Sequence, residues 1–166
     1  MIRLTVILLF VVAPMTIYPQ QGKTITPPAD TAPVSEQQKW LVNAMSKYAS
    51  YKTPTTSVKI SSPKIEACVL SFTQTRKFGS TLEEKTLIIT TRTDTLKDNV
   101  SIDLAKIDIP SLKLSDYILP ELSTFSFRIK RSETSFRDLE LVLQRPAADA
   151  IKTTLERVAR ACAPNH

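Results

Sequence analysis

The sequence predicts an α+β fold: a helix, then a run of short antiparallel strands, then a second helix. Three observations carry this prediction. Apolar residues recur at helical spacing from residue 40 to 48, alternate with polar residues through the middle of the chain, and return to helical spacing near its end. The chain has 166 residues, 42% of them hydrophobic, which suits one domain with its own core. We expect an antiparallel meander of about six strands, curled into a roll or half-barrel and closed by the C-terminal amphipathic helix.

Residues 1–20 have the pattern of a secretory signal peptide. Arg3 precedes the apolar run Leu4–Ala13, which Pro14 ends. The run is shorter than the roughly 18 residues that a membrane-spanning helix needs. We therefore expect an exported protein, periplasmic or extracellular, with no integral membrane span after cleavage. The alternative is that residues 4–13 form an uncleaved anchor or a buried strand.

Residues 21–34 are rich in proline and threonine and show no periodicity. Such a composition buries too little apolar surface to offset the entropy of ordering, which predicts a linker. Residues 35–166 then form a single α+β domain.

The first helix is predicted to begin at Ser35. Gln38 follows three residues later, which is the spacing of a capping box. One apolar stripe follows at helical spacing: Trp40, Leu41, Ala44, Met45 and Tyr48. This stripe can pack on the domain or bind a partner. The stretch from Ser50 to Pro63 is again rich in threonine, serine and proline, and we expect no strand there.

After Pro63 the apolar period becomes two, which predicts strands. The residues that define them are Cys68, Leu70 and Phe72; Leu87, Ile88 and Ile89; Val100, Ile102 and Leu104; Leu112 and Leu114; Phe125, Phe127 and Ile129; and Leu139, Leu141 and Leu143. We expect turns near Phe78-Gly79, at 93–98 and at 131–135. No helical segment separates these strands, which favours an antiparallel meander over parallel units.

The second helix is predicted to begin at Pro146 and to end before Pro164. Its apolar residues fall at positions i, i+4, i+7 and i+11: Ile151, Leu155, Val158 and Cys162. Charged residues lie off this face, so the helix is amphipathic and one side of it covers the strands.

The two cysteines, Cys68 and Cys162, sit on apolar faces of elements at opposite ends of the predicted domain. An even number of cysteines in an oxidising compartment favours a disulfide. Two separate buried thiols are the alternative. Two cysteines without histidine make a poor metal site, so we expect no metal.

Few residues are available for catalysis. The chain has two glycines, which excludes glycine-rich phosphate loops, and its one histidine is the terminal His166. Asp94, Asp98, Asp103 and Asp108 lack the spacing of a calcium loop and are interpreted as turn residues. The best carboxylate pair, Asp103 and Glu140, has nothing to bring its members together. We expect no enzyme and no cofactor.

Basic residues form a possible anion-binding patch: Arg76, Lys77, Arg128, Lys130 and Arg137. Arg76 and Lys77 fall in the first predicted interstrand loop, and Arg128 and Lys130 share one strand face. Arg137 joins them only if it precedes its strand, because it has the parity of the inward Leu139. Phe125 and Phe127 point into the core, so the stacking surface of a nucleic-acid-binding protein is missing.

The layout from Ser57 to Cys162 resembles the pleckstrin-homology-like barrel, in which a final helix closes one end of a bent sheet. Residues 148–162 stand in the position of that helix. The chain is also similar to small exported bacterial proteins of unknown function that carry one such domain. The resemblance implies that Arg76 and Lys77 match the loop that binds anionic headgroups in some members. The tryptophan usual in the closing helix is absent here, since the only tryptophan is Trp40.

These observations together favour an exported, non-catalytic domain. Its expected partner is an envelope protein or an anionic surface, and nucleic acid is not expected. The alternative is a carrier of lipid or another small ligand, with a cavity between the sheet and the C-terminal helix. A hydrolytic enzyme is the least favoured function, because no nucleophile has an internal base beside it.

Overall fold

The computed structural model describes residues 25–53, 55–78, 94–132 and 134–163. The predicted signal peptide and the strand expected at Leu87–Ile89 lie outside these residues. The elements follow one another as α1 (Val34–Tyr48), β1 (Tyr51–Lys52), β2 (Thr56–Glu66), β3 (Val69–Phe78), β4 (Asp94–Asp103), the short 3-10 helix η1 (Leu104–Lys106), β5 (Ile107–Asp116), β6 (Leu122–Lys130), β7 (Phe136–Gln144) and α2 (Arg145–Cys162).

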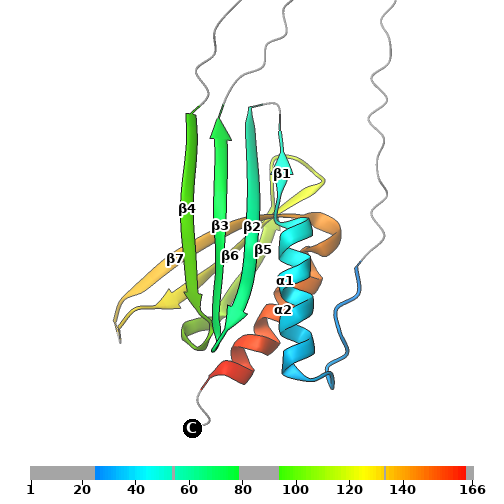
Figure 1. The fold of residues 1–166 in the computed structure, drawn as a ribbon, viewed down its shortest axis with the longest axis vertical. Coiled ribbons are helices and arrows are strands. Elements are labelled where there is room, and N and C mark those ends of the chain that lie inside the picture. The colour runs from blue at the N-terminus through cyan, green and yellow to red at the C-terminus, as the bar shows by residue number, and fades with distance from the viewer. Residues whose placement is uncertain (1–24, 54, 79–93, 133, 164–166) are drawn as a thin grey trace, which may run out of the picture.

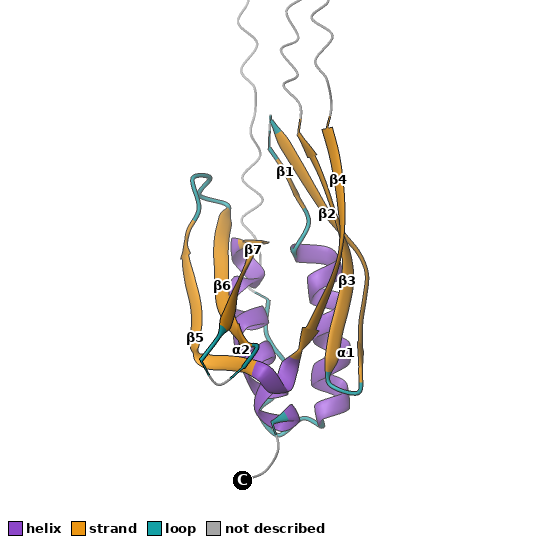
Figure 2. Ribbon diagram, turned by 90° about the vertical axis from the view of Figure 1, so that its left-hand side faces the viewer, coloured by secondary structure: helices purple, strands orange, loops and turns teal. Residues whose placement is uncertain are grey.

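The strands form two antiparallel sheets, which confirms the α+β class. Sheet A contains β1–β4 in that order, and sheet B contains β5–β7 (Figures 1 and 2). The two sheets do not close into a barrel. The prediction of one curled meander was therefore wrong in this respect. The turn η1 explains the difference, because it carries the chain from the end of β4 into a second sheet instead of back along the first.

Sheet A is built of long antiparallel strands, and the upper ends of β2, β3 and β4 project beyond the helices in Figure 1. β3 and β4 pair without a break from Val69↔Asp103 to Phe78↔Asp94. Residues 94–98 of the turn predicted at 93–98 are thus part of β4, and Asp98 lies opposite Gln74 within it. Arg76 and Lys77, expected in a loop, lie in β3. Residues 95–99 are all exposed, so this end of the strand lacks the apolar alternation by which strands are recognised.

β2 was not expected, because its sequence is rich in serine and threonine and contains Pro63. One extra residue bulges out of β2 between Ser61 and Lys64, where Ser62 adopts a positive φ of 52°. A bulge accommodates a proline within a strand because the ladder is interrupted there. Val58 and Ile60, which precede the bulge, are buried.

Helix α1 packs on β2 and on α2, so its apolar stripe faces the domain. Leu41 and Met45 are almost fully buried, and Trp40 is partly buried against the same core. The predicted capping box is not formed: the N-cap is Pro33, and no side chain caps the helix. The backbone N–H groups of Glu36 and Gln37 donate to the Pro33 carbonyl.

Helix α2 has the predicted apolar face. Ile151, Leu155 and Val158 are at most 2% exposed and pack in one core with residues of both sheets. Phe125 and Phe127 enter this core from sheet B, as predicted, with ring centroids 5.2 Å apart. Among the described residues, no helix is long and apolar enough to cross a membrane.

The described part of the predicted linker lies against the domain. The Ile25 backbone N–H donates to the Pro146 carbonyl at 3.2 Å, and Ile25 contacts the core. Arg157 of α2 donates to the Pro28 carbonyl at 2.8 Å and forms an ion pair with Asp30. These contacts hold residues 25–30 along α2, although their composition gives no sign of it.

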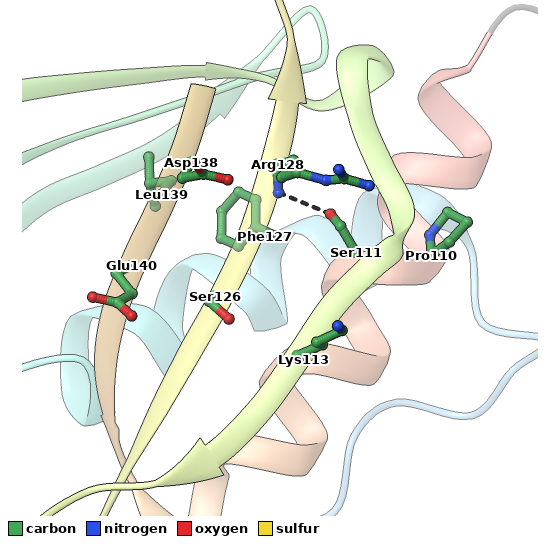
Figure 3. A pocket seen from close by; sticks show the side chains of 9 residues that line it. All are labelled: Pro110, Ser111, Lys113, Ser126, Phe127, Arg128, Asp138, Leu139 and Glu140. Atoms are coloured by element: carbon green, nitrogen blue, oxygen red, sulfur yellow. Dashed lines mark hydrogen bonds between the residues drawn. The ribbon is translucent and has the colours of Figure 1, made fainter. Parts of the chain in front are cut away.

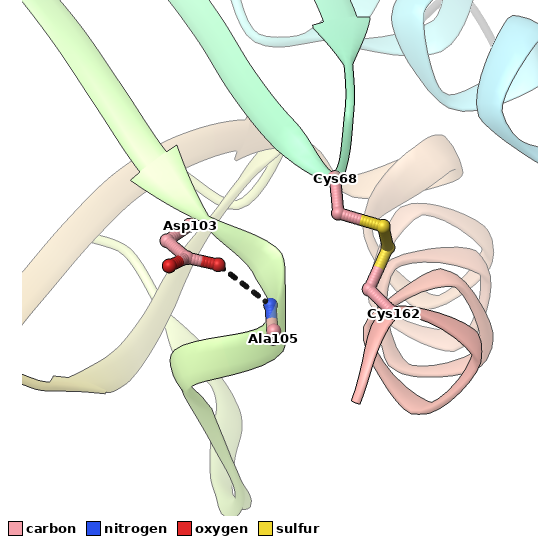
Figure 4. The surroundings of a disulfide bond; sticks show 4 residues. All are labelled: Cys68, Asp103, Ala105 and Cys162. Atoms are coloured by element: carbon pink, nitrogen blue, oxygen red, sulfur yellow. Dashed lines mark hydrogen bonds between the residues drawn. A yellow bond between two sulfur atoms is a disulfide. The ribbon is translucent and has the colours of Figure 1, made fainter. Parts of the chain in front are cut away.

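The predicted disulfide is present: Cys68 and Cys162 are bonded, with Cα atoms 5.7 Å apart (Figure 4). The position of Cys68 differs from the prediction. Cys68 occupies the two-residue turn between β2 and β3, where Glu66 pairs with Val69, and is not on the strand face of Leu70. Ala67 and Cys68 both have positive φ, 45° and 62°. A two-residue hairpin turn of the favoured hand requires positive φ at both positions.

Candidate functional site

A hollow of about 650 Å³ lies on the outer face of sheet B, away from α2. We call it the sheet B hollow. Its lining comes from all three strands of the sheet (Figure 3): Pro110, Ser111, Lys113, Ser126, Phe127, Arg128, Asp138, Leu139 and Glu140. Phe127 and Leu139 are buried residues beneath it, whereas its charged residues are exposed.

The rim of the hollow is a loop within β5. Between the pairs Asp108↔Arg128 and Lys113↔Ser126, β5 advances five residues while β6 advances two. Pro110 lies in this loop, where its missing N–H disturbs no ladder. Ser111 replaces the missing ladder bond: its Oγ accepts from the Arg128 N–H at 2.8 Å and donates to the Asp108 carbonyl at 2.6 Å. The Ser111 hydroxyl therefore ties the rim to the backbone of Asp108 and Arg128.

Two rows of cross-strand neighbours cover the face of the hollow. One row runs Lys113, Ser126, Glu140 across β5, β6 and β7. The next row runs Asp108, Arg128, Asp138 across the same strands. Neighbours in a row lie about 5 Å apart on the same face. Each row has a cation and at least one carboxylate, so the face has mixed charge.

Arg128 is already occupied within the protein. Its guanidinium group forms an ion pair with Asp108 and lies 5.0 Å from the centroid of the Phe136 ring. Lys113, Asp138 and Glu140 form no ion pair with other described residues. The two rows together carry two cations and three carboxylates, a formal charge of −1 on a protein of net charge +6.

The five residues of the predicted anion-binding patch are distributed over both faces of both sheets. Arg128 and Lys130 share the outer face of sheet B, as expected. Arg137 lies within β7 opposite the buried Ile129, so it has inward parity and is exposed only because it stands near the end of the sheet. Arg76 and Lys77 are consecutive in β3 and so point to opposite faces of sheet A.

Arg76 lies on the inner face of sheet A with Tyr51, since both are cross-strand neighbours of Val58. It donates to Gln74 Oε1 at 2.9 Å, and its Nε is buried with no hydrogen-bond partner among the described residues. The pKa of Tyr51 is raised to about 12, mainly by burial and in smaller part by the neighbouring Tyr117, whereas Arg76 acts to lower it. Leu96 and Phe78, on the same face, are 52% and 40% exposed.

The predicted carboxylate pair is not assembled. Asp103 ends β4 in sheet A, where its Oδ1 accepts from the Ala105 N–H at 3.1 Å and caps η1 (Figure 4). Glu140 lies in the sheet B hollow. Within the described residues, no group of three or more histidine, cysteine or acidic side chains is arranged to hold a metal ion.

The sheet B hollow was not foreseen in the sequence. The residues predicted to form a strand there were Leu112 and Leu114 alone, although β5 begins at Ile107. Pro110 within an otherwise strand-like segment is the signal that could have indicated a loop in the strand. No protein-family model and no curated protein matches this chain.

Proposed function

We propose that this protein is an exported, non-catalytic binding domain of the cell envelope, and that its partner binds in the sheet B hollow. The apolar N-terminal segment supports export, and the disulfide is compatible with an oxidising compartment. We also propose that the domain is related in layout to the pleckstrin-homology-like proteins and to small exported bacterial proteins. Support for this comes from the hairpins that precede the C-terminal helix.

One observation carries the proposed site: Lys113 and Glu140 present opposite, exposed charges on the two sides of Ser126, and neither is paired with a described residue. Both are fixed to strands at known register. The register sets the order in which a partner meets the two charges across the sheet, and both side chains are exposed to it.

The chemistry of the hollow favours binding over catalysis. Ser111 and Ser126 are its hydroxyls, and the Ser111 hydroxyl already holds the β5 loop. A serine nucleophile needs a base beside it. The sole histidine of the chain is the terminal residue, and both cysteines form the disulfide.

The carrier alternative receives less support. It requires a cavity between sheet B and α2, where the structure has packed side chains. Ile151, Leu155 and Val158 on that face of α2 are at most 2% exposed, and Phe125 opposite them is fully buried.

Site-specific photo-crosslinking in the native host tests the proposed function. A photoreactive amino acid replaces Ser126 in the hollow or, as a control, Ser101 on the outer face of β4 in sheet A. We expect a discrete adduct from position 126 and none from position 101. Adding Lys113→Gln and Glu140→Gln to the probe variant should abolish the adduct. Equal adducts at both positions, or an adduct that survives the two substitutions, would contradict the proposed site.

The intact mass of the protein from its host tests export. We expect a mass that lacks about 20 residues and two thiols that react only after reduction. A full-length mass with two free thiols would contradict export.

A further inference from the structure

We propose that the ligand of the sheet B hollow is a zwitterion: a small molecule with a primary ammonium group at one end and a phosphate or carboxylate group at the other. This inference rests on the proposed function and names the chemistry that the hollow would recognise. It follows from the order of charges across the sheet and from the state of Arg128.

The charges of the hollow are separated across the strands. Lys113 stands on β5, the small hydroxyl of Ser126 lies on β6, and Glu140 stands on β7. Asp138 lies on the same face of β7 two residues from Glu140, so the β7 side carries two carboxylates. A ligand with one charge satisfies only one side. A ligand with both charges satisfies Lys113 through its anionic group and the β7 carboxylates through its ammonium group.

The three strands set the order of contacts on the ligand. The backbones of β5 and β7 are separated by two strand spacings, about 10 Å. The Lys113 and Glu140 side chains are long and exposed, so each charged group can reach toward Ser126 from its own strand. A ligand with a short linker between its charged groups then bridges the two side chains through a charge-assisted hydrogen bond at each end. The Ser126 hydroxyl beneath the linker can donate to a phosphate or carboxylate oxygen.

Arg128 does not convert the hollow into a simple anion site. Its charge is balanced by Asp108 on one side, and Asp138 is its cross-strand neighbour on the other. Lys113 is then the one lining cation without an ion pair among the described residues. An anion alone would meet more carboxylates than free cations in this hollow, whereas the ammonium group of a zwitterion compensates them.

Isothermal titration calorimetry of the disulfide-intact protein with phosphoethanolamine tests the inference. We expect saturable binding at low ionic strength. Inorganic phosphate and ethanolamine, each with one of the two charges, should bind at least about tenfold more weakly, because each loses a charged hydrogen bond. Binding of phosphate as tight as that of phosphoethanolamine would overturn the zwitterion assignment, and so would the absence of phosphoethanolamine binding.

Matched variants test whether the ligand binds in the sheet B hollow. Lys113→Gln and Glu140→Gln should each weaken phosphoethanolamine binding by about tenfold or more. Lys130→Gln is the control, since Lys130 is exposed on the same face but does not line the hollow. All three residues are exposed, and circular dichroism verifies that the variants fold. Equal affinity in wild type and the two lining variants would overturn the site.

Two further comparisons distinguish a membrane headgroup from a small solute, and a wrong ligand class from a wrong proposed function. Vesicles that contain phosphatidylethanolamine should retain the protein more than phosphatidylcholine vesicles if the zwitterion is a membrane headgroup; binding of the soluble compound alone indicates a small solute. Both results support the zwitterion. A crosslink at position 126 in the host without phosphoethanolamine binding would reject the ligand class and keep the proposed function. Absence of both the crosslink and phosphoethanolamine binding would reject both.

Discussion

Cys68 and Cys162 are joined although 94 residues separate them in the chain, and their bond fastens the β2–β3 turn to the last turn of α2. The Cys68 carbonyl also accepts from the Leu104 N–H at 2.9 Å, at the start of η1. The turn of sheet A, the closing helix and the passage into sheet B thus meet at one place (Figure 4). This relationship makes the disulfide the link between the two halves of the fold.

Removal of the disulfide should lower the free energy of unfolding by about 4–5 kcal/mol, the value that loss of a closed loop of this length implies. The variant is the double substitution Cys68→Ala/Cys162→Ala, which leaves no free thiol. Urea unfolding followed by circular dichroism measures the change. Reducing agent should shift the wild-type midpoint down and leave that of the variant in place. Identical midpoints for wild type and variant would contradict the linking role.

The β2–β3 turn itself should be improved by Ala67→Asn. Ala67 has a φ of 45°, a region that costs an ordinary residue energy and that asparagine tolerates. We expect a gain of about 0.5–1 kcal/mol in the free energy of unfolding, seen as a higher melting temperature. Ala67→Val, with a branched side chain at positive φ, is the matched control and should lower stability. If asparagine destabilises the protein as valine does, the turn is not of the assigned type.

Ser111→Ala should loosen the rim of the sheet B hollow. The substitution removes the hydroxyl that accepts a 2.8 Å hydrogen bond from the Arg128 N–H. We expect the free energy of unfolding to fall by about 1 kcal/mol, a modest loss because water can replace this acceptor at an exposed amide. The measurement is hydrogen exchange at the Arg128 amide, which should become at least about fivefold faster. Ser115→Ala is the control, since Ser115 is exposed on the same strand. Equal exchange rates in the two variants would show that Ser111 does not hold the loop.

The free energy of unfolding should fall between pH 10 and about 12, in part through Tyr51. Burial raises the pKa of this hydroxyl from 10.0 to about 12. In this interval the unfolded chain releases the Tyr51 proton while the folded chain retains it, so a rise in pH favours unfolding. Tyr51→Phe should reduce the slope. The difference in absorbance at 295 nm between wild type and variant reports the ionisation directly. A midpoint near 10 for the ionisation of Tyr51 would contradict the burial of its side chain against Tyr117.

Sequence patterns predicted those elements whose apolar residues enter the core. The stripe of α2 and the alternation in β6 and β7 correspond to buried residues such as Leu155, Phe125 and Leu141, because burial selects for this periodicity. The disulfide followed from the number of cysteines and the predicted compartment. In these helices and strands, the local periodicity and the packing of the core require the same residues to be apolar.

The remaining features depend on polar sequence. The outer half of the β3–β4 hairpin is exposed on most positions, so Asp98 was predicted to lie in a turn although it pairs with Gln74 in the ladder. β2 was obscured by Pro63, which a bulge accommodates. The sheet B hollow brings together residues from three strands, and only the register places Lys113, Ser126 and Glu140 in one row.

The most direct test of the account is to map phosphoethanolamine onto the disulfide-intact domain by NMR. We expect the largest shifts of backbone amide signals, on titration to saturation, at Lys113, Ser126, Asp138 and Glu140, with little change at Ser101 on sheet A. Shifts concentrated on the inner face of sheet A near Arg76 and Leu96, or no localised shifts at saturation, would contradict the assignment of the sheet B hollow as the binding site.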